Sequence, residues 1–162
     1  MILSQEFSQN YERIVWVDSD ILINWYNAPC IVTDVAIEKV GAVLSWATAN
    51  EKLSTEAQTR LFTHWGITDE ITAKSTYIKY GLPGDFDRIV QSGVLVLSPK
   101  YHRHILEEIY YQYEDRGYGE MAPVSYELLK SELVQWIDYR YNLTWMIQKA
   151  LYYPFWRCIF VG

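Results

Sequence analysis

Short apolar runs alternate with amphipathic stretches along the chain, and this alternation predicts an α/β fold. Four consecutive apolar residues at 14–17 end abruptly in Asp18-Ser19-Asp20, a pattern typical of a strand buried on both faces that leads into a polar loop. Two more strands are predicted at 41–46 and 88–97, the second interrupted by Gln91-Ser92-Gly93. A glycine inside a strand indicates a bulge or a close approach of backbone or ligand.

Apolar residues that recur at three- and four-residue spacing predict helices in the other stretches. The predicted helices cover 54–65, 69–80, 100–116, a segment ending near 132, and 141–151, with a short strand at 133–137 before the last. His102 and His104 lie on the third helix, two residues apart and therefore on different faces. We expect both, and the lone His64, to be solvated surface residues and not a metal site.

Length and composition are those of one globular domain, residues 1–162, with 50% hydrophobic and 21% charged residues. The 20 acidic and 14 basic residues give a formal net charge of -6, so nucleic acid is not an expected partner. Cys30 and Cys158 form neither a metal-type cluster nor a disulfide framework, which favours a reducing, cytoplasmic setting. We expect no secretory signal and no transmembrane segment.

Asp18 and Asp20 are the candidate metal ligands. In an extended backbone, side chains at i and i+2 point to the same side, so both carboxylates can converge on one cation while Ser19 faces away. Hard divalent ions such as Mg²⁺ prefer oxygen ligands, and two carboxylates together with substrate phosphates commonly hold one. The alternative is a tight reversal of the chain, because Asp and Ser are also ordinary turn residues.

Three segments in order along the chain carry a resemblance to a known family: 15–20 with Asp18 and Asp20, 90–96 with Gln91-Ser92-Gly93, and 136–142 with Tyr141-Asn142. Together they resemble nucleotide-sugar glycosyltransferases of the GT-A fold, especially those of family 8. The resemblance covers roughly residues 11–150. It implies a mixed sheet flanked by helices, without the N-terminal nucleotide-binding half of the family.

The resemblance also implies roles for individual residues. Asp18 and Asp20 would bind the Mn²⁺ or Mg²⁺ that bridges the diphosphate of a nucleotide-sugar donor, with UDP as the expected nucleotide and the acceptor unknown. Glu120 would be a catalytic carboxylate near the anomeric carbon. The alternative is that Glu120 is a solvated turn residue. The residues expected beside the donor or acceptor are Ser19, Gln91 (in place of the family's Asn), Ser92, Gly93, Ser125, Tyr126, Tyr141 and Asn142. Of these, Tyr126 is also typical of a core aromatic and Asn142 of a helix cap.

The chain departs from the family pattern in two ways. Only 17 residues precede Asp18, and no histidine follows His104, where the family supplies a third metal ligand near its C-terminus. Three explanations are open: the sequence is a fragment of a longer enzyme, it is a shortened relative that lost donor binding, or another chain completes the site.

Two other functions compete with the transferase. A haloacid-dehalogenase-like phosphohydrolase also opens with an apolar strand ending in Asp-x-Asp, with Asp18 as nucleophile, Asp20 as general acid and Mg²⁺ alongside. Leu22 departs from that pattern, and the one further Asp-x-Asp in the sequence is Asp85-Phe86-Asp87. The non-enzymatic alternative is a binding or assembly module that associates through an aromatic C-terminal stretch comprising Trp145, Tyr152, Tyr153, Phe155, Trp156 and Phe160, rings that equally suit a core.

Overall fold

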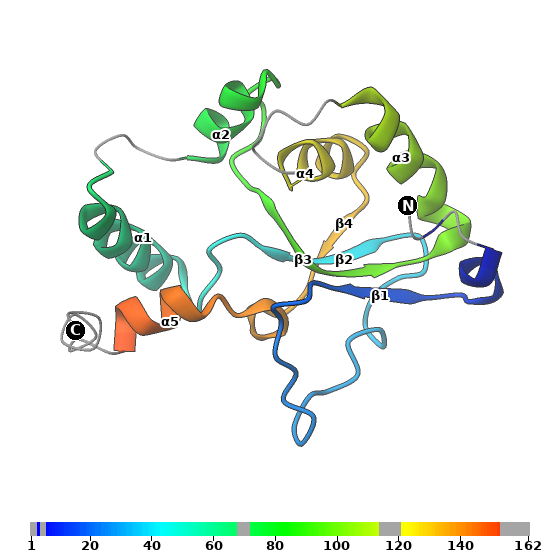
Figure 1. Ribbon diagram of the computed structural model, residues 1–162, viewed down its shortest axis with the longest axis horizontal. Coiled ribbons are helices and arrows are strands. Elements are labelled where there is room, and N and C mark those ends of the chain that lie inside the picture. Colours follow the sequence, from blue (N-terminus) through cyan, green and yellow to red (C-terminus); the bar gives the residue numbers. More distant parts are fainter. Residues whose placement is uncertain (1–2, 4–5, 68–71, 114–120, 153–162) are drawn as a thin grey trace.

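The computed structural model describes residue 3 and residues 6–67, 72–113 and 121–152, and these form an α/β fold with a mixed four-stranded sheet and five α-helices (Figure 1). The strands are β1 (Ile14–Val17), β2 (Val40–Leu44), β3 (Val90–Leu97) and β4 (Val134–Trp136). The helices are α1 (Glu51–Trp65), α2 (Ala73–Tyr80), α3 (Pro99–Gln112), α4 (Met121–Lys130) and α5 (Trp145–Tyr152), with 3₁₀ turns η2 (Glu6–Asn10) and η3 (Tyr139–Asn142). The α/β fold and the mixed sheet predicted from the sequence are confirmed.

The sheet is organised around β3, in the order β1-β3-β2-β4. β3 runs antiparallel to both of its neighbours, and β2 runs parallel to β4. The pairing of β2 with β3 shifts between Ala42, which lies opposite Leu95, and Val43, which lies opposite Gln91. Residues 92–94 of β3 therefore have no partner on β2, and the bulge expected from the glycine in this run is confirmed.

β1 differs from its prediction. Four apolar residues in a row predicted a strand buried on both faces, but within the described chain β1 is an edge strand with β3 as its one neighbour. Val15 is 37% exposed and Trp16 38% exposed. An apolar run shows that a segment can be buried, but it does not show whether other elements cover both faces of the sheet at that strand.

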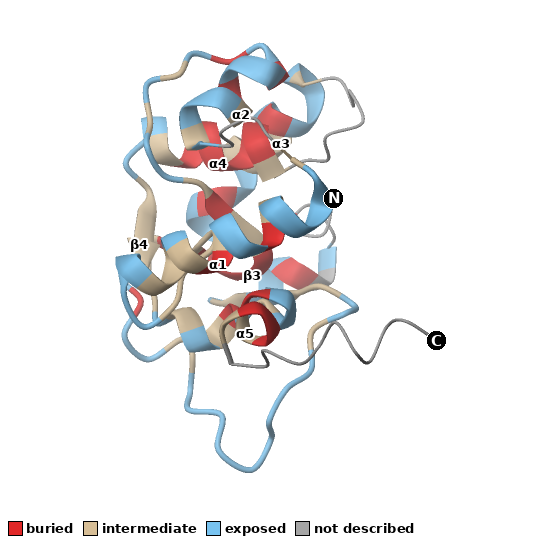
Figure 2. Cartoon of the chain, turned by 90° about the vertical axis from the view of Figure 1, so that its left-hand side faces the viewer, coloured by how far each residue is buried: buried red, intermediate tan, exposed pale blue. Residues whose placement is uncertain are grey.

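The main core lies between the sheet and the helices α3 and α4, which Figure 1 shows together over the sheet. Leu128 of α4 and Ile109 of α3 pack with Val40, Ala42 and Leu95 of the strands. Figure 2 shows this buried band running through the middle of the molecule, with exposed residues on the outer surfaces of the helices. Within the described ranges, no helix combines the length and the apolar character needed to cross a membrane.

The helix ends follow local capping chemistry. α1 begins earlier than predicted because Asn50 is its cap, with the Leu53 amide donating to Asn50 Oδ1 at 3.0 Å, and it ends at Gly66 as predicted, where φ is 69°. α2 is capped by Thr72, and the earlier start predicted at 69 falls on residues outside the described ranges.

The single helix predicted at 141–151 is instead two elements, η3 and α5. Asp138 caps η3, and Asn142 lies at its end and is buried, so Asn142 is not a helix cap. α5 packs against α1 through Ile147 and Ala150. Trp145 is 62% exposed, and the rest of the predicted aromatic surface lies outside the side chains that the structure describes.

His102 corrects a second prediction. It is fully buried, whereas His104 on the same helix is exposed as expected. The Ser98 amide donates to His102 Nδ1 at 2.8 Å, which leaves Nε2 as the donor to the Glu38 carbonyl at 3.1 Å. The imidazole therefore joins the start of α3 to the segment before β2, a connection between distant segments that helical spacing does not reveal.

We expect His102 to make the stability of the protein pH-dependent. Burial lowers the pKa of His102, since the charged form would be desolvated and would lose the acceptor for Ser98 N. At a pH above about 6.5 both folded and unfolded states hold a neutral imidazole, and below it the unfolded state takes up the proton first. The free energy of unfolding, measured by urea titration, should fall as the pH is lowered from 7 to 5, with a contribution of at most about 1.4 kcal/mol per pH unit.

The variant His102→Asn, whose amide oxygen can still accept from Ser98 N, should flatten this pH dependence. His104→Asn is the matched control, because His104 is exposed on the same helix beside Glu108. An unchanged slope in His102→Asn would contradict this assignment.

Candidate functional site

Three of the segments singled out in the sequence meet at the bulge of β3. The Asp18 amide donates to the Gly93 carbonyl at 2.9 Å, where β1 ends. A Cβ placed on Gly93 would lie 3.0 Å from Asn142 Nδ2 and 3.5 Å from Asp18 Oδ2. The carboxylate of Asp18 and the amide of Asn142 therefore border the same point of β3, and a side chain at Gly93 would contact both of them.

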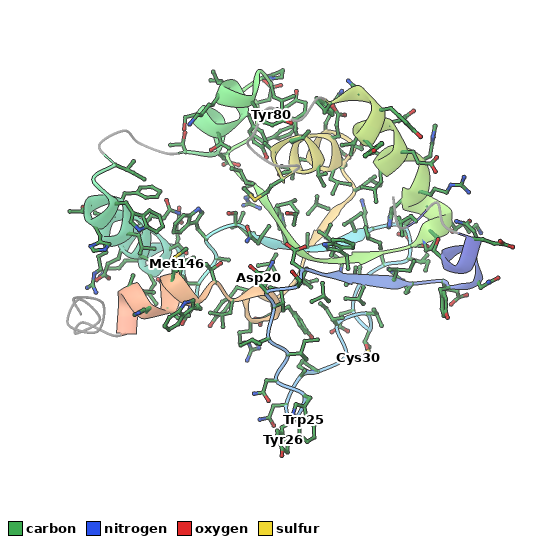
Figure 3. The ribbon with its side chains drawn as sticks, viewed as in Figure 1. Asp20, Trp25, Tyr26, Cys30, Tyr80 and Met146 are labelled. Carbon is green, nitrogen blue, oxygen red and sulfur yellow. The ribbon has the colours of Figure 1, made fainter. Side chains whose placement is uncertain are left out.

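A turn sets the position of Asp18. The Ile21 amide donates to the Asp18 carbonyl at 3.1 Å, which closes a turn over residues 18–21. The backbone is thus not extended from Asp18 to Asp20, and alternation along a strand does not place their side chains on one side. Ser19 and Asp20 are exposed in this turn, and Figure 3 shows Asp20 where the chain leaves the sheet. The turn chemistry weighed as an alternative is present, and it presents Asp20 to solvent.

Trp16 holds one of the Asp18 oxygens. Its indole Nε1 donates to Asp18 Oδ1 at 2.8 Å, which orients the carboxylate and leaves Oδ2 on the side of Gly93. Sequence reasoning treated Trp16 only as an apolar strand residue. The available signal was its position two residues before Asp18, since side chains at i and i+2 of a strand end can meet.

Asn142 is the unusual polar residue of the site. It is 6% exposed, and its Nδ2 has no hydrogen-bond partner among the described residues. η3, which carries it, packs against β2 and β3 and is fixed by Asp138, which accepts from the Arg140 amide at 2.9 Å and from the Arg140 guanidinium. These hydrogen bonds hold the pKa of Asp138 below its usual value. A buried amide without a partner costs free energy, which makes Asn142 Nδ2 a group whose role the packing of the described residues does not explain.

The residues at the turn fit part of a cation's ligand set. Asp18 and Asp20 supply carboxylate oxygens, which suit Mg²⁺ or Mn²⁺. Among the residues that the structure describes, no group of three or more His, Cys, Asp or Glu side chains could hold a metal ion. A cation here would therefore take its other ligands from water and from a bound phosphate, as Mg²⁺ commonly does.

Other predicted site residues lie near the bulge or outside the described chain. Gln91 and Ser92 are half-buried on β3, and Tyr141 is half-buried beside Asn142 on η3. Glu120, the predicted catalytic carboxylate, falls outside the described ranges.

Ser125 and Tyr126 belong to a separate buried cluster under α2. The Val90 amide donates to Ser125 Oγ at 2.7 Å, and Ser125 Oγ lies 2.7 Å from the Tyr77 hydroxyl, which donates to the Arg88 carbonyl. Tyr126 packs edge-on against Tyr77. Burial is the main cause of the raised pKa of both Tyr77 and Tyr126. These contacts give Ser125 and Tyr126 a role in packing α4 against α2 and β3.

Comparisons with models of protein families, with curated proteins and with solved structures give no match to this chain.

We expect Gly93→Ala to destabilise the protein by about 1–3 kcal/mol, because the new methyl group overpacks the space beside Asn142. Asn142 is buried and cannot move aside easily. The double variant Gly93→Ala/Asn142→Ala should cost less than the sum of the two single changes, as measured by urea unfolding. Gly84→Ala is the control: there the new Cβ meets mainly the flexible Ile78 side chain, from 3.2 Å. Equal losses for Gly93→Ala and Gly84→Ala would contradict the close approach.

We expect Ser125→Ala to lower the free energy of unfolding by about 1–3 kcal/mol, because it leaves the buried Val90 amide without an acceptor. Ser131→Ala, at an exposed serine just after α4, should be neutral within about 0.5 kcal/mol. Urea unfolding of both variants checks this. A fully stable Ser125→Ala protein would contradict the packing role and favour the ligand-binding role predicted from the sequence.

Proposed function

We propose that this chain is the metal-binding portion of a glycosyltransferase that takes a sugar from a nucleotide-sugar donor, with UDP as the nucleotide. The observation that carries the proposal is the convergence of Asp18, Gly93 and Asn142. They come from the three segments whose order along the chain resembles the GT-A glycosyltransferases of family 8. The mixed sheet is also of the kind that the resemblance implies.

The two carboxylates have separate tasks. Asp18, fixed by Trp16, provides a rigid oxygen at the edge of the sheet, and Asp20 provides an exposed oxygen that can turn toward a ligand. Together they would hold the cation against the diphosphate of the donor. The chemistry that a bound divalent ion supplies is neutralisation of the charge that develops on the leaving nucleoside diphosphate.

Gly93 and Asn142 would position the donor. An oxygen of the sugar or phosphate would approach the backbone at Gly93, where no side chain intervenes, and would accept a hydrogen bond from Asn142 Nδ2, which has no partner among the described residues. The amide is buried and held by η3, so its orientation is fixed before the ligand arrives.

The transfer breaks the bond between the anomeric carbon and the diphosphate oxygen and forms one to an acceptor hydroxyl oxygen, whose proton passes to a base. Glu120 is the carboxylate that the resemblance assigns near the anomeric carbon.

The proposal predicts that Mn²⁺ and UDP bind together. Calorimetric titration of the chain with UDP should show binding that depends on Mn²⁺, and Asp20→Ala should weaken it at least about tenfold because the cation loses one of two protein ligands. Asp18→Asn should have a similar effect while retaining the hydrogen bond from Trp16 Nε1. Asp87→Ala, at an exposed aspartate near the start of β3, is the matched control and should bind as the wild type does.

Two results would count against the transferase. One is the absence of Mn²⁺-dependent UDP binding by the folded wild-type chain. The other is metal-dependent release of phosphate from p-nitrophenyl phosphate that disappears in Asp18→Asn, which would favour the phosphohydrolase.

A further inference from the structure

We infer that the free edge of β1 is an interaction surface that accepts an extended strand from a partner polypeptide. β1 has one neighbour in the described sheet, β3, and its other edge is unpaired. This inference comes from the hydrogen bonding and exposure of β1 and does not depend on the proposed enzymatic function.

The register of the sheet identifies the backbone groups that are free. Asp18 N donates to Gly93 O in the register that places Val17 opposite Val94, so residues 14, 16 and 18 point their backbone groups toward β3. Val15 and Val17 therefore point theirs away from the sheet. No hydrogen bond joins these outward groups to any other part of the described chain. Two donors and two acceptors are thus ready for a further strand.

The side chains of β1 are those of an internal strand. Natural edge strands usually carry a lysine, a proline or a bulge that discourages pairing. The segment Ile14-Val15-Trp16-Val17 has none of these, and Val15 and Trp16 are more than a third exposed. A strand with an open edge and exposed β-branched and aromatic side chains is a template for strand addition.

The loop that follows β1 extends the apolar surface. Residues 21–33 contain no charged side chain, and the loop exposes Leu22 (96%), Ile23 (63%), Trp25 (75%) and Tyr26 (76%). Trp25 and Tyr26 stack on each other at the tip, with ring centroids 3.7 Å apart. Figures 1 and 3 show this loop projecting beyond β1, on the side away from β3. A partner that adds a strand to β1 would therefore also bury part of this loop.

The charges beside β1 disfavour pairing of its free edge with a second copy of the chain. Antiparallel self-pairing that places Val15 opposite Val17 brings Glu12, just before β1 of one copy, to the end of β1 of the other, where Asp18 and Asp20 follow. If the two copies of Val15 face each other, Glu12 faces Asp18. A register that places the two copies of Val17 opposite each other leaves only that residue pair to form hydrogen bonds between the copies, because β1 ends at Val17. Like charges directly opposite are destabilising, and each copy carries a net charge of -6. The edge instead fits a strand of alternating apolar residues with basic residues at its ends.

A synthetic peptide, Lys-Val-Thr-Val-Thr-Val-Lys, is the probe. At a peptide concentration about ten times its Kd, hydrogen exchange at the Val15 and Val17 amides should slow about tenfold, since exchange then proceeds from the free fraction. The Trp16 amide, which already bonds to β3, should change little. Residue-resolved NMR of the wild-type chain measures all three.

The controls distinguish pairing with the edge of β1 from non-specific binding of the peptide. Val15→Pro removes an outward amide without touching the bonds to β3 and should abolish the slowing at Val17, whereas Val15→Thr should keep it. The same peptide with glutamate at both ends should bind at least about tenfold more weakly. Unchanged exchange at Val15 and Val17, or equal binding by Val15→Pro, would overturn the inference. A dimer of the chain alone that protects these amides would assign the edge to a second copy instead.

Discussion

The absence of a side chain at Gly93 is the constraint on which the candidate site depends. β3 pairs with two strands, and at residues 92–94 its ladder with β2 is interrupted. At that point Asp18 approaches from β1 and Asn142 from η3, the latter within 3.0 Å of where a Cβ would be. Any larger residue would push the carboxylate and the amide apart. Glycine thus allows groups from three segments to come together at a break in sheet pairing.

The sequence predicted the elements better than it predicted their surroundings. Helix α1 with its stop at Gly66, strand β3 with its irregularity, and strand β4 all follow from periodicity and glycine placement, which act within a few residues. Exposure depends on what packs from elsewhere. The sequence predicted buried positions for Val15 and Trp16, but both lie partly exposed on an edge strand. It predicted a surface position for His102, which is buried between the start of α3 and Glu38.

The residues of the candidate site were also easier to predict than their surroundings. Asp18, Gly93 and Asn142 were each singled out from local patterns, and the fold brings them together. Ser125 was grouped with them by resemblance, but its hydroxyl links α4 to Val90 in the core. The hydrogen bond from Trp16 to Asp18 and the buried position of Asn142 needed coordinates, because they depend on a turn and a 3₁₀ segment whose geometry is not encoded in an apolar pattern.

The wrong prediction of burial for β1 and the free edge of β1 are related. Four consecutive apolar residues are the usual pattern of a strand covered on both faces, but Val15 and Trp16 are each more than a third exposed, and within the described chain β1 has a neighbouring strand on one side only. A partner strand along Val15 and Val17 would make β1 an internal strand, and the partner's side chains beside Val15 and Trp16 would reduce the exposure of both. Since β1 ends at Val17 and Asp18 follows at once, the added strand would also end beside the turn that carries both carboxylates. The surface that would receive a partner and the site that would receive a ligand therefore meet at one turn, where the partner's basic end would lie beside the carboxylates of Asp18 and Asp20.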